Sequence, residues 1–468
     1  MKRFINALFF VLIACAVFGQ GKAKYVFYFI GDGMGVNQVN GTEMYLAAQE
    51  GRIGTKSLRF TQFPVVSMIT TFSSTNSVTD SSAAGTALAA GEKTYNGAIG
   101  VDDNEERLTS VAEMAKRSGK KVGVTSSVSI DHATPAAFYA HQKKRTMYYE
   151  IALDLPKAGF DFYGGAGFLK PTTTFSKTEA PSIFPIFEDA GYTIARGYND
   201  FKAKSSSADK MVLIQPETAN SGMLTYAIDR KEGDLKLSEI TESAIEFLTR
   251  NNDSGFFLMQ EGGSIDWACH DNDAATTFKE IIDMDEAIQV AYEFYLKHPD
   301  ETLIVVTADH ETGGMGLGRG KYELNLKALD YQKTSPGVLS IKIRELRKAK
   351  DHKVSWKEVK HLLGEEMGFW RELSLTKEQE KKLKDCYEET FSPSWNAKME
   401  KSMYTKSEPL AAKAKEVMNE IAMVGWISGG HTAGYVPVYA IGADSHLFTG
   451  KMDNTDIPKR IAVAGGYQ

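Results

Sequence analysis

The stretch YVFYFIGDGMG, from Tyr25 to Gly35, decides the fold, because six apolar residues run directly into a glycine-rich turn that carries an aspartate. Short apolar runs rich in β-branched or aromatic residues are typical of strands buried on both faces of a parallel sheet. Three more runs have this character and span residues 121–125, 255–260 and 302–307. The sequence therefore predicts four buried strands.

Helical patterns lie between these runs. Residues 104–118 and 238–250 place apolar side chains at spacings of three and four, which is the period of an amphipathic helix. Alternation of strands with helices is typical of a mostly parallel sheet that is covered on both faces. We therefore expect an α/β fold, a three-layer sandwich in which a mostly parallel central sheet is flanked by helices.

Two segments differ in amino-acid composition from these strands and helices. Residues from about 320 to 425 are charged and helical, with capping-box patterns at Ser355 and Thr376 and a helix expected from Pro409 to about Met423. They predict a helical insertion whose charged side chains face water, before a strand pattern returns at 436–441. Residues from about 160 to 230 are rich in Gly, Ser, Thr and Pro, and they predict a loop-rich excursion.

Residues 1–20 have the layout of a secretory signal peptide, because Lys2 and Arg3 precede a short apolar stretch. We expect the mature domain to span residues 21–468 and to be periplasmic or secreted. Cys15 lies in a stretch that resembles a lipoprotein box, which leaves a lipid anchor open. No other segment approaches the roughly eighteen apolar residues of a membrane-spanning helix, so no transmembrane span is expected.

Charge and cysteine content narrow the function classes further. The chain has 468 residues and a formal net charge of -6, which argues against nucleic acid as the principal partner because such surfaces are usually basic. Only Cys269 and Cys386 remain after the signal peptide, so we expect no disulfide framework.

Carboxylate and imidazole side chains follow the predicted strands. Ligands of an open parallel sheet bind beyond the carboxyl ends of its strands, so these side chains should meet at one edge. Several buried carboxylates repel one another unless cations neutralise them. Oxygen ligands suit Mg²⁺, and mixed imidazole and carboxylate sets suit Zn²⁺. The strand-end residues of this kind are Asp32, Asp131, His132, Glu261, Asp266, His270, Asp309 and His310, with His431 near the C-terminus.

The glycines around Asp32 have a competing interpretation as a dinucleotide-binding loop. Their spacing is not G-x-G-x-x-G, and the Asp32 carboxylate would face an anionic pyrophosphate. A tight turn around a metal-binding aspartate explains these glycines better.

Small residues run into a helix at VTDSSAAGTA, from Val78 to Ala87. One interpretation is a capped helix that packs closely against its neighbours. The other is that a serine hydroxyl at the helix N-terminus meets free N–H groups and the positive end of the helix dipole, which favours attack on a phosphoryl group. The residue pattern alone leaves both open.

Together these motifs resemble the alkaline phosphatase family over nearly the whole mature chain apart from the two excursions. The nucleophile signature of that family, an Asp-Ser followed by small residues and Thr, is matched from Asp80 to Thr86, which implies Ser81 rather than Ser82 as the nucleophile. The resemblance also implies two zinc ions and one magnesium ion. One zinc would be held by Asp266, His270 and His431, the other by Asp32, Asp309 and His310, and the magnesium by Asp32, Thr134 and Glu261.

The resemblance also implies a phosphate-binding arginine eleven residues after Thr134, whose hydroxyl would bind magnesium. That arginine is Arg145. A planar guanidinium can hold a phosphoryl group with two parallel hydrogen bonds. Near the ligands, His132 and Trp267 differ from some family members, and we expect them to influence hydrogen bonding and magnesium affinity there.

The resemblance implies hydrolysis of small phosphate monoesters to phosphate and an alcohol through a phosphoserine, often by a homodimer. The alternatives are a phosphodiesterase, sulfatase or phosphoglycerate mutase of the same superfamily, or a secreted protein that binds phosphate or metal without catalysis. Arg145 together with the magnesium set favours monoesters, because all three equatorial oxygens of a phosphoryl group then have partners.

Overall fold

The computed structural model describes residues 23–216, 219–220, 222–320, 322–350, 353–392 and 398–468. The expected signal peptide over residues 1–20 and the lipid-anchor site at Cys15 lie outside the described residues. Within the described ranges, none of the helices combines the length and the apolar character that crossing a membrane requires.

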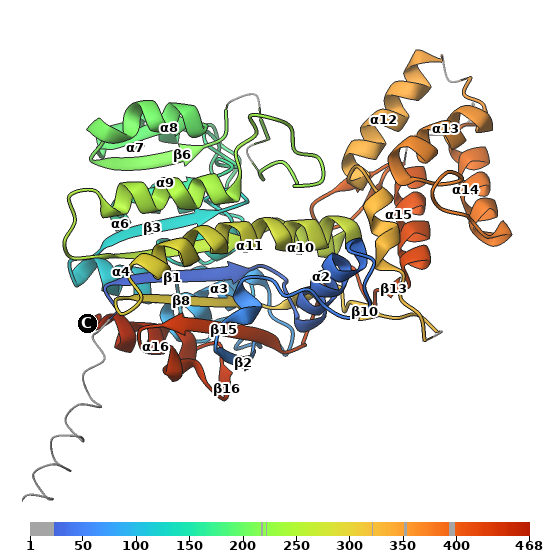
Figure 1. Ribbon diagram of the computed structural model, residues 1–468. Coiled ribbons are helices and arrows are strands. Elements are labelled where there is room, and N and C mark those ends of the chain that lie inside the picture. The colour runs from blue at the N-terminus through green and yellow to red at the C-terminus, as the bar shows by residue number, and fades with distance from the viewer. Residues whose placement is uncertain (1–22, 217–218, 221, 321, 351–352, 393–397) are drawn as a thin grey trace, which may run out of the picture.

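The four predicted strands form the centre of a ten-stranded sheet and are parallel to one another (Figure 1). Ile30 of the first strand pairs with Glu261 on one side and with Thr307 on the other, so the carboxyl ends of three strands are level. These central strands, in spatial order, are β8 (Thr302–Ala308), β1 (Tyr25–Gly31), β7 (Phe256–Gly262) and β3 (Lys121–Ser126).

Three parallel strands extend the sheet beyond β3, and they come from the segment that was expected to be loop-rich. That prediction was wrong for these strands, which have only four or five residues and show no long apolar run. Beyond β8 the returning strand is antiparallel to both neighbours. The outer strands are β4 (Phe162–Gly165), β6 (Lys210–Ile214) and β5 (Tyr192–Arg196) on one side, and β15 (Val436–Gly442), β2 (Val65–Thr70) and β16 (Lys451–Asp453) on the other.

Helices cover the sheet and complete the three layers (Figure 1). One set, α9 (Leu237–Thr249) and α11 (Ala274–Lys297), packs together, and a second set comprises α3 (Ser81–Ala90), α4 (Val111–Arg117) and α16 (Asp456–Gly465). The helix predicted over 238–250 is thus confirmed as α9.

The helix predicted over residues 104–118 is wrong in its first half, because α4 begins only at Val111. The Asp102 carboxylate accepts hydrogen bonds from the backbone N–H groups of Asn104 and Glu106, each at 2.8 Å. A local side-chain bond of this kind satisfies the backbone in a turn and competes with the helix. The helix is instead capped by Ser110, which forms a capping box with Glu113.

Four helices of the charged segment gather at one end of the molecule, around a second cluster of buried apolar side chains (Figure 1). The capping boxes predicted at Ser355 and Thr376 are both present. These helices are α12 (Pro336–Ala349), α13 (Trp356–Met367), α14 (Lys377–Thr390) and α15 (Pro409–Ala422), with a hairpin of β11 (Glu400–Lys401) and β12 (Lys406–Ser407) before the last of them.

The other elements are short or connect these layers. They are α2 (Val36–Gln49), α5 (Ala133–Ala136), α6 (Tyr148–Ala158), α7 (Ile183–Asp189), α8 (Tyr198–Lys204), α10 (Ser264–His270), β9 (Glu311–Thr312), β10 (Gly316–Leu317), β13 (Val424–Gly425), β14 (His431–Thr432), and the 3₁₀ turns η1 (Phe60–Gln62), η2 (Ser205–Ser207), η3 (Leu326–Tyr331) and η4 (Ser445–Phe448).

Candidate active site

The level ends of the central strands bring the predicted side chains to one edge of the sheet. Asp32 directly follows β1, Glu261 lies near the end of β7, and Asp309 begins the segment after β8. On α10, Asp266 and His270 are four residues apart and so share a helix face. His431 lies on β14, which pairs with β9.

Asp266, His270 and His431 form one compact group of possible metal ligands, whose ligand atoms lie within 4.8 Å of one another. The Nδ1 atom of His270 donates to the Gly429 carbonyl at 2.7 Å, and that of His431 donates to the Thr79 carbonyl at 2.8 Å. Each Nδ1 therefore carries a hydrogen. The two Nε2 atoms, which remain as possible metal ligands, lie only 3.1 Å apart. Backbone bonds that fix the tautomer in this way are typical of metal-binding histidines.

Asp32, His310 and Asp266 form a second group of this kind. Nε2 of His310 lies 3.3 Å from Oδ1 of Asp32 and 3.4 Å from Oδ2 of Asp309. The structure thus brings together the second set of residues that the resemblance implied, and it adds Asp266 as a neighbour.

Asp32, His132 and Glu261 form a third group. The structure therefore places His132 in one group with Asp32 and Glu261, two residues that the resemblance assigned to magnesium. Thr134 lies in the same cluster, and its Oγ1 donates to Oδ2 of Asp309 at 3.3 Å. The Ser126 hydroxyl donates a short hydrogen bond to Glu261 and orients that carboxylate.

The glycine-rich turn after β1 supports this cluster through its backbone. Gly33 has a φ of +71°, and its N–H donates to Oδ1 of Asp309 at 3.1 Å. A Cβ atom at Gly33 would lie 2.9 Å from Oγ1 of Thr312 and 3.0 Å from Oδ1 of Asp266. Any larger residue would therefore collide with the ligand residues, which agrees with a turn built around a metal site.

The buried carboxylates carry more negative charge than the described protein groups neutralise. Among the described residues, both carboxylate oxygens of Asp32, Oδ2 of Asp266 and Oε1 of Glu261 have no hydrogen-bond partner. Burial and the neighbouring carboxylates raise the pKa of Asp32 and of Asp309 well above the ordinary value, and burial raises the pKa of Glu261 to about 7. Burial also opposes ionisation of Asp266, but the nearby histidines hold its pKa well below the ordinary value.

These residues fit divalent cations. The orphaned carboxylate oxygens and the facing imidazole nitrogens supply the mixed donor set of zinc and the oxygen donors of magnesium. Cations in these positions would offset the repulsion that raises the carboxyl pKa values.

Two serines begin α3, and they have different surroundings. Oγ of Ser81 lies 3.2 Å from Nε2 of His310 and so faces the ligand groups. Oγ of Ser82 donates to Oδ2 of Asp80 at 2.6 Å and accepts from the N–H of Gly97 at 3.0 Å. Ser82 therefore helps to hold the helix N-cap, whereas the Ser81 hydroxyl faces the possible metal ligands.

Arg145 reaches the same helix end from the loop between α5 and α6. Its Nη1 forms an ion pair with Oδ2 of Asp80 at 3.1 Å. Its Nη2 lies 3.4 Å from Nε2 of His132 and donates to Oη of Tyr404 at 3.2 Å. The guanidinium thus lies between the start of α3 and the third group of possible ligands.

The residues that sequence reasoning missed hold these groups in place. Oγ1 of Thr312 donates to Oδ1 of Asp266 at 2.6 Å, and its position two residues after His310 was an available signal. The Trp267 ring was expected near the site and is stacked on Tyr404, with centroids 4.5 Å apart. Tyr404 itself was not expected, because it belongs to the charged helical segment and is 259 residues from Arg145.

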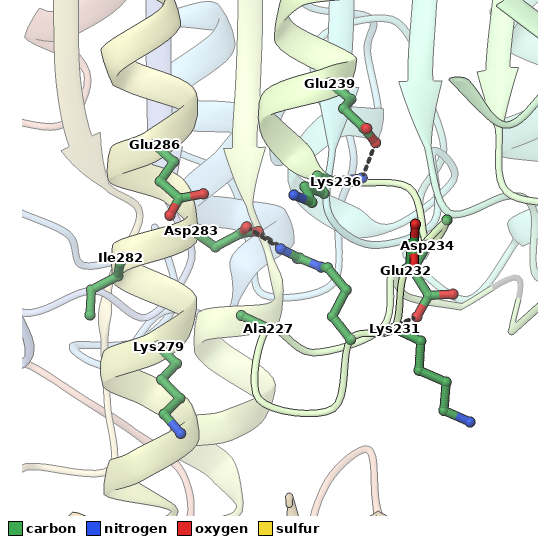
Figure 2. A pocket seen from close by; sticks show the side chains of 12 residues that line it. Ala227, Lys231, Glu232, Asp234, Lys236, Glu239, Lys279, Ile282, Asp283 and Glu286 are labelled. Atoms are coloured by element: carbon green, nitrogen blue, oxygen red, sulfur yellow. Dashed lines mark hydrogen bonds and ion pairs between the residues drawn. The ribbon is translucent and has the colours of Figure 1, made fainter. Parts of the chain in front are cut away.

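A separate cavity of about 620 Å³ lies beside α11, and none of the predicted site residues lines it (Figure 2). Charges of both signs line the cavity, and several are already paired. Arg230 and Asp283 form a two-pronged ion pair at 2.5 and 2.9 Å, while the Glu239 carboxylate accepts from the Lys236 backbone. Arg230 and Asp283 therefore already satisfy each other, and the cavity lies apart from the predicted site residues.

Comparisons with known proteins identify one family. A family model described as alkaline phosphatase matches residues 23–162 and 198–467. Alkaline phosphatase 3 of Bacillus subtilis (strain 168) is 32% identical over 467 residues, covering 96% of this chain and 90% of the relative.

Solved structures give the same result. A cold-active alkaline phosphatase from a psychrophilic Shewanella species superposes with a TM-score of 0.78 at 28% identity, covering 94% of this chain and 99% of that one. The alkaline phosphatase of the Antarctic bacterium TAB5 gives a TM-score of 0.66 at 27% identity, covering 96% of this chain and 99% of its own.

Proposed function

The chain belongs to the alkaline phosphatase family, and we propose that it hydrolyses phosphate monoesters to phosphate and an alcohol through a phosphoserine at Ser81. One observation carries this proposal. Oγ of Ser81 lies at a buried helix N-terminus, 3.2 Å from His310 and beside three groups of possible metal ligands. A helix N-terminus favours the negative charge of a phosphoryl group.

We assign the ligands as the family register and the clustering support. One zinc ion is assigned to Asp266, His270 and His431, a second to Asp32, Asp309 and His310, and a magnesium ion to Asp32, Thr134 and Glu261. Bound there, the cations supply Lewis-acid charge that stabilises the transition state and lowers the pKa of a coordinated hydroxyl or water.

The proposed reaction consists of two in-line displacements at phosphorus, in which Ser81 and Arg145 have different roles. The Ser81 hydroxyl gives up its proton and its oxygen forms a bond to phosphorus, while the bond from phosphorus to the ester oxygen breaks and the leaving oxygen takes up a proton to become an alcohol. Water then attacks phosphorus from the side opposite the Ser81 oxygen, and the bond from that oxygen to phosphorus breaks. Phosphate is released, and a proton given up by the water restores the Ser81 hydroxyl. Arg145 binds non-bridging oxygens in both steps, with its guanidinium oriented by Asp80.

The substrate class is tested by comparing an aryl phosphate, its methyl diester and an aryl sulfate. We expect kcat/KM for the aryl phosphate to exceed that for the diester by about 10² or more. In the diester one phosphate oxygen carries a methyl group, so the groups that would bind that oxygen are left without a partner. Faster hydrolysis of the diester or the sulfate would favour a phosphodiesterase or a sulfatase. Absence of turnover with all three, in protein loaded with Zn²⁺ and Mg²⁺, would favour a non-catalytic binding protein.

His132 supports a specific prediction about magnesium. Burial and the positive charge of Arg145 lower the pKa of His132 to about 3, so it is a neutral imidazole beside Asp32 and Glu261. Magnesium prefers oxygen ligands and octahedral geometry. We expect His132→Asp to tighten Mg²⁺ binding by about tenfold, measured by Mg²⁺ titration of the zinc-loaded protein. Unchanged or weaker Mg²⁺ binding would contradict the placement of the magnesium ion.

We further propose that two copies form a homodimer and that the mature protein is periplasmic or secreted. Val66 and Met68 are two residues apart on β2, so they lie on the same face of the sheet, and their side chains are exposed. Exposed apolar neighbours are typical of contact surfaces. Light scattering should give the mass of two chains, and the mass of one chain would contradict the homodimer.

A further inference from the structure

The hairpin between α14 and α15 brings the charged helical segment into the active site. Its two strands, β11 and β12, pair antiparallel, and Tyr404 lies in the turn that joins them. The neighbouring Thr405 donates from Oγ1 to Oδ1 of Asp271 at 2.8 Å, directly after the ligand helix α10. This bond anchors the turn at the edge of the metal-ligand groups.

Tyr404 is fixed in place by aromatic contacts on several sides. Its ring stacks on Trp267 with an interplanar angle of 8° and centroids 4.5 Å apart. The rings of His270 and His132 meet it edge-on at 5.4 and 5.8 Å. Aromatic pairs of these geometries are favourable beyond the area that they bury. The phenol oxygen therefore has a defined position.

That oxygen accepts a hydrogen bond from Arg145, and the bond completes the support of the guanidinium. Asp80 holds Nη1 at 3.1 Å, while Nη2 donates to Tyr404 at 3.2 Å and lies 3.4 Å from Nε2 of His132. A guanidinium is a rigid planar fork, so anchors on both terminal nitrogen atoms fix its plane. Without the Tyr404 oxygen, Nη2 keeps only the longer contact to His132, and the plane is held less firmly. A fixed plane loses less entropy when it binds two phosphate oxygens.

We propose that Tyr404 is a positioning residue that holds Arg145 in its phosphate-binding orientation. Through this contact, the charged helical segment sets how tightly the site holds a phosphoryl group. The inference rests on the proposed role of Arg145. The sequence predicted only a helical insertion whose charged side chains face water. The inference gives this insertion a role at the active site.

The test uses Tyr404→Phe in the full-length, metal-loaded protein. Phenylalanine keeps the stack on Trp267 and removes only the acceptor, so the fold should persist with an unchanged melting temperature. We expect KM for an aryl phosphate and the Kd of inorganic phosphate, measured by calorimetry, to rise together by about tenfold, while kcat changes less. Tyr322→Phe serves as the matched control because that tyrosine is fully exposed in the same segment. The control should leave both constants unchanged.

A double-mutant cycle separates positioning from a direct or merely structural role. In the Arg145→Ala background, adding Tyr404→Phe should change phosphate affinity by less than about twofold, because the group that it positions is gone. Unchanged affinity in the single variant Tyr404→Phe would overturn the inference, and so would a tenfold loss that persists without Arg145. If Arg145→Ala alone left phosphate affinity unchanged, the proposed role of Arg145 would fail together with this inference.

Discussion

Replacing Ser81 by alanine is expected to lower kcat for a phosphate monoester by a factor on the order of 10³ or more. The variant removes the atom that would bond to phosphorus, and among the described residues that atom makes a hydrogen-bonding contact only with His310. The metal-ligand groups should therefore stay intact, and metal content should equal that of the unaltered protein. Steady-state kinetics and elemental analysis measure the two effects.

Ser82→Ala is the matched control, since the two serines are adjacent on α3. Ser82 contributes hydrogen bonds to Asp80 and to the backbone of Gly97, so its loss should loosen the N-cap and lower activity by less than about tenfold. The reverse order, with a large loss for Ser82→Ala and a small one for Ser81→Ala, would transfer the role of nucleophile to Ser82. Equal and negligible turnover of the unaltered protein and of Ser81→Ala would support a binding protein instead.

Removal of metal ions by a chelator is expected to abolish activity and to lower the melting temperature. The ligand carboxylates are buried and lack partners, so ions that bind only the folded chain stabilise it by about 4 kcal/mol at a thousandfold excess over Kd. Restoring Zn²⁺ and Mg²⁺ together should recover both properties, whereas either ion alone should recover them in part. Full activity after exhaustive chelation would contradict a metal-dependent site.

The loss of stability without metal should depend on pH in a defined direction. The folded, metal-free protein holds protons on Asp32, Asp309 and Glu261 to higher pH than the unfolded chain does. Because the folded state binds more protons, its stability falls as pH rises from the ordinary carboxyl range toward about 7, the value for Glu261. Asp266, whose pKa is lowered, stays ionised throughout this window.

The difference in melting temperature between metal-loaded and metal-free protein should therefore widen as pH rises through this window. Thermal unfolding at a series of pH values measures it. A difference that narrowed with rising pH would show that these carboxyl groups do not carry the raised pKa values.

Much of the site could be predicted because its residues follow long apolar strands. A fully buried run such as Tyr25–Ile30 has few alternatives to a central strand, and parallel strands bring Asp32 and Asp309 to one edge. The division of ligands among ions followed from the family resemblance and stays a prediction. So do the roles of Ser81 and Arg145.

The parts that could not be predicted depend on contacts between distant segments. The strands β4, β5 and β6 are short, so their stability comes from pairing within the sheet rather than from an apolar pattern of their own. Tyr404 was missed because nothing in a charged hairpin indicates a stacking partner in Trp267. Such a position is set by how the helical segment packs.

The central claim is that Ser81 carries the phosphoryl group between the two displacements, and trapping that intermediate tests it most directly. The metal-loaded protein would be incubated with inorganic phosphate at acidic pH, quenched, digested and analysed by tandem mass spectrometry. The account predicts one phosphoryl group on the peptide that contains Ser81, assigned to Ser81 by fragmentation and absent from Ser81→Ala. Phosphorylation of Ser82, or turnover of a phosphate monoester with no phosphoserine trapped, would contradict it.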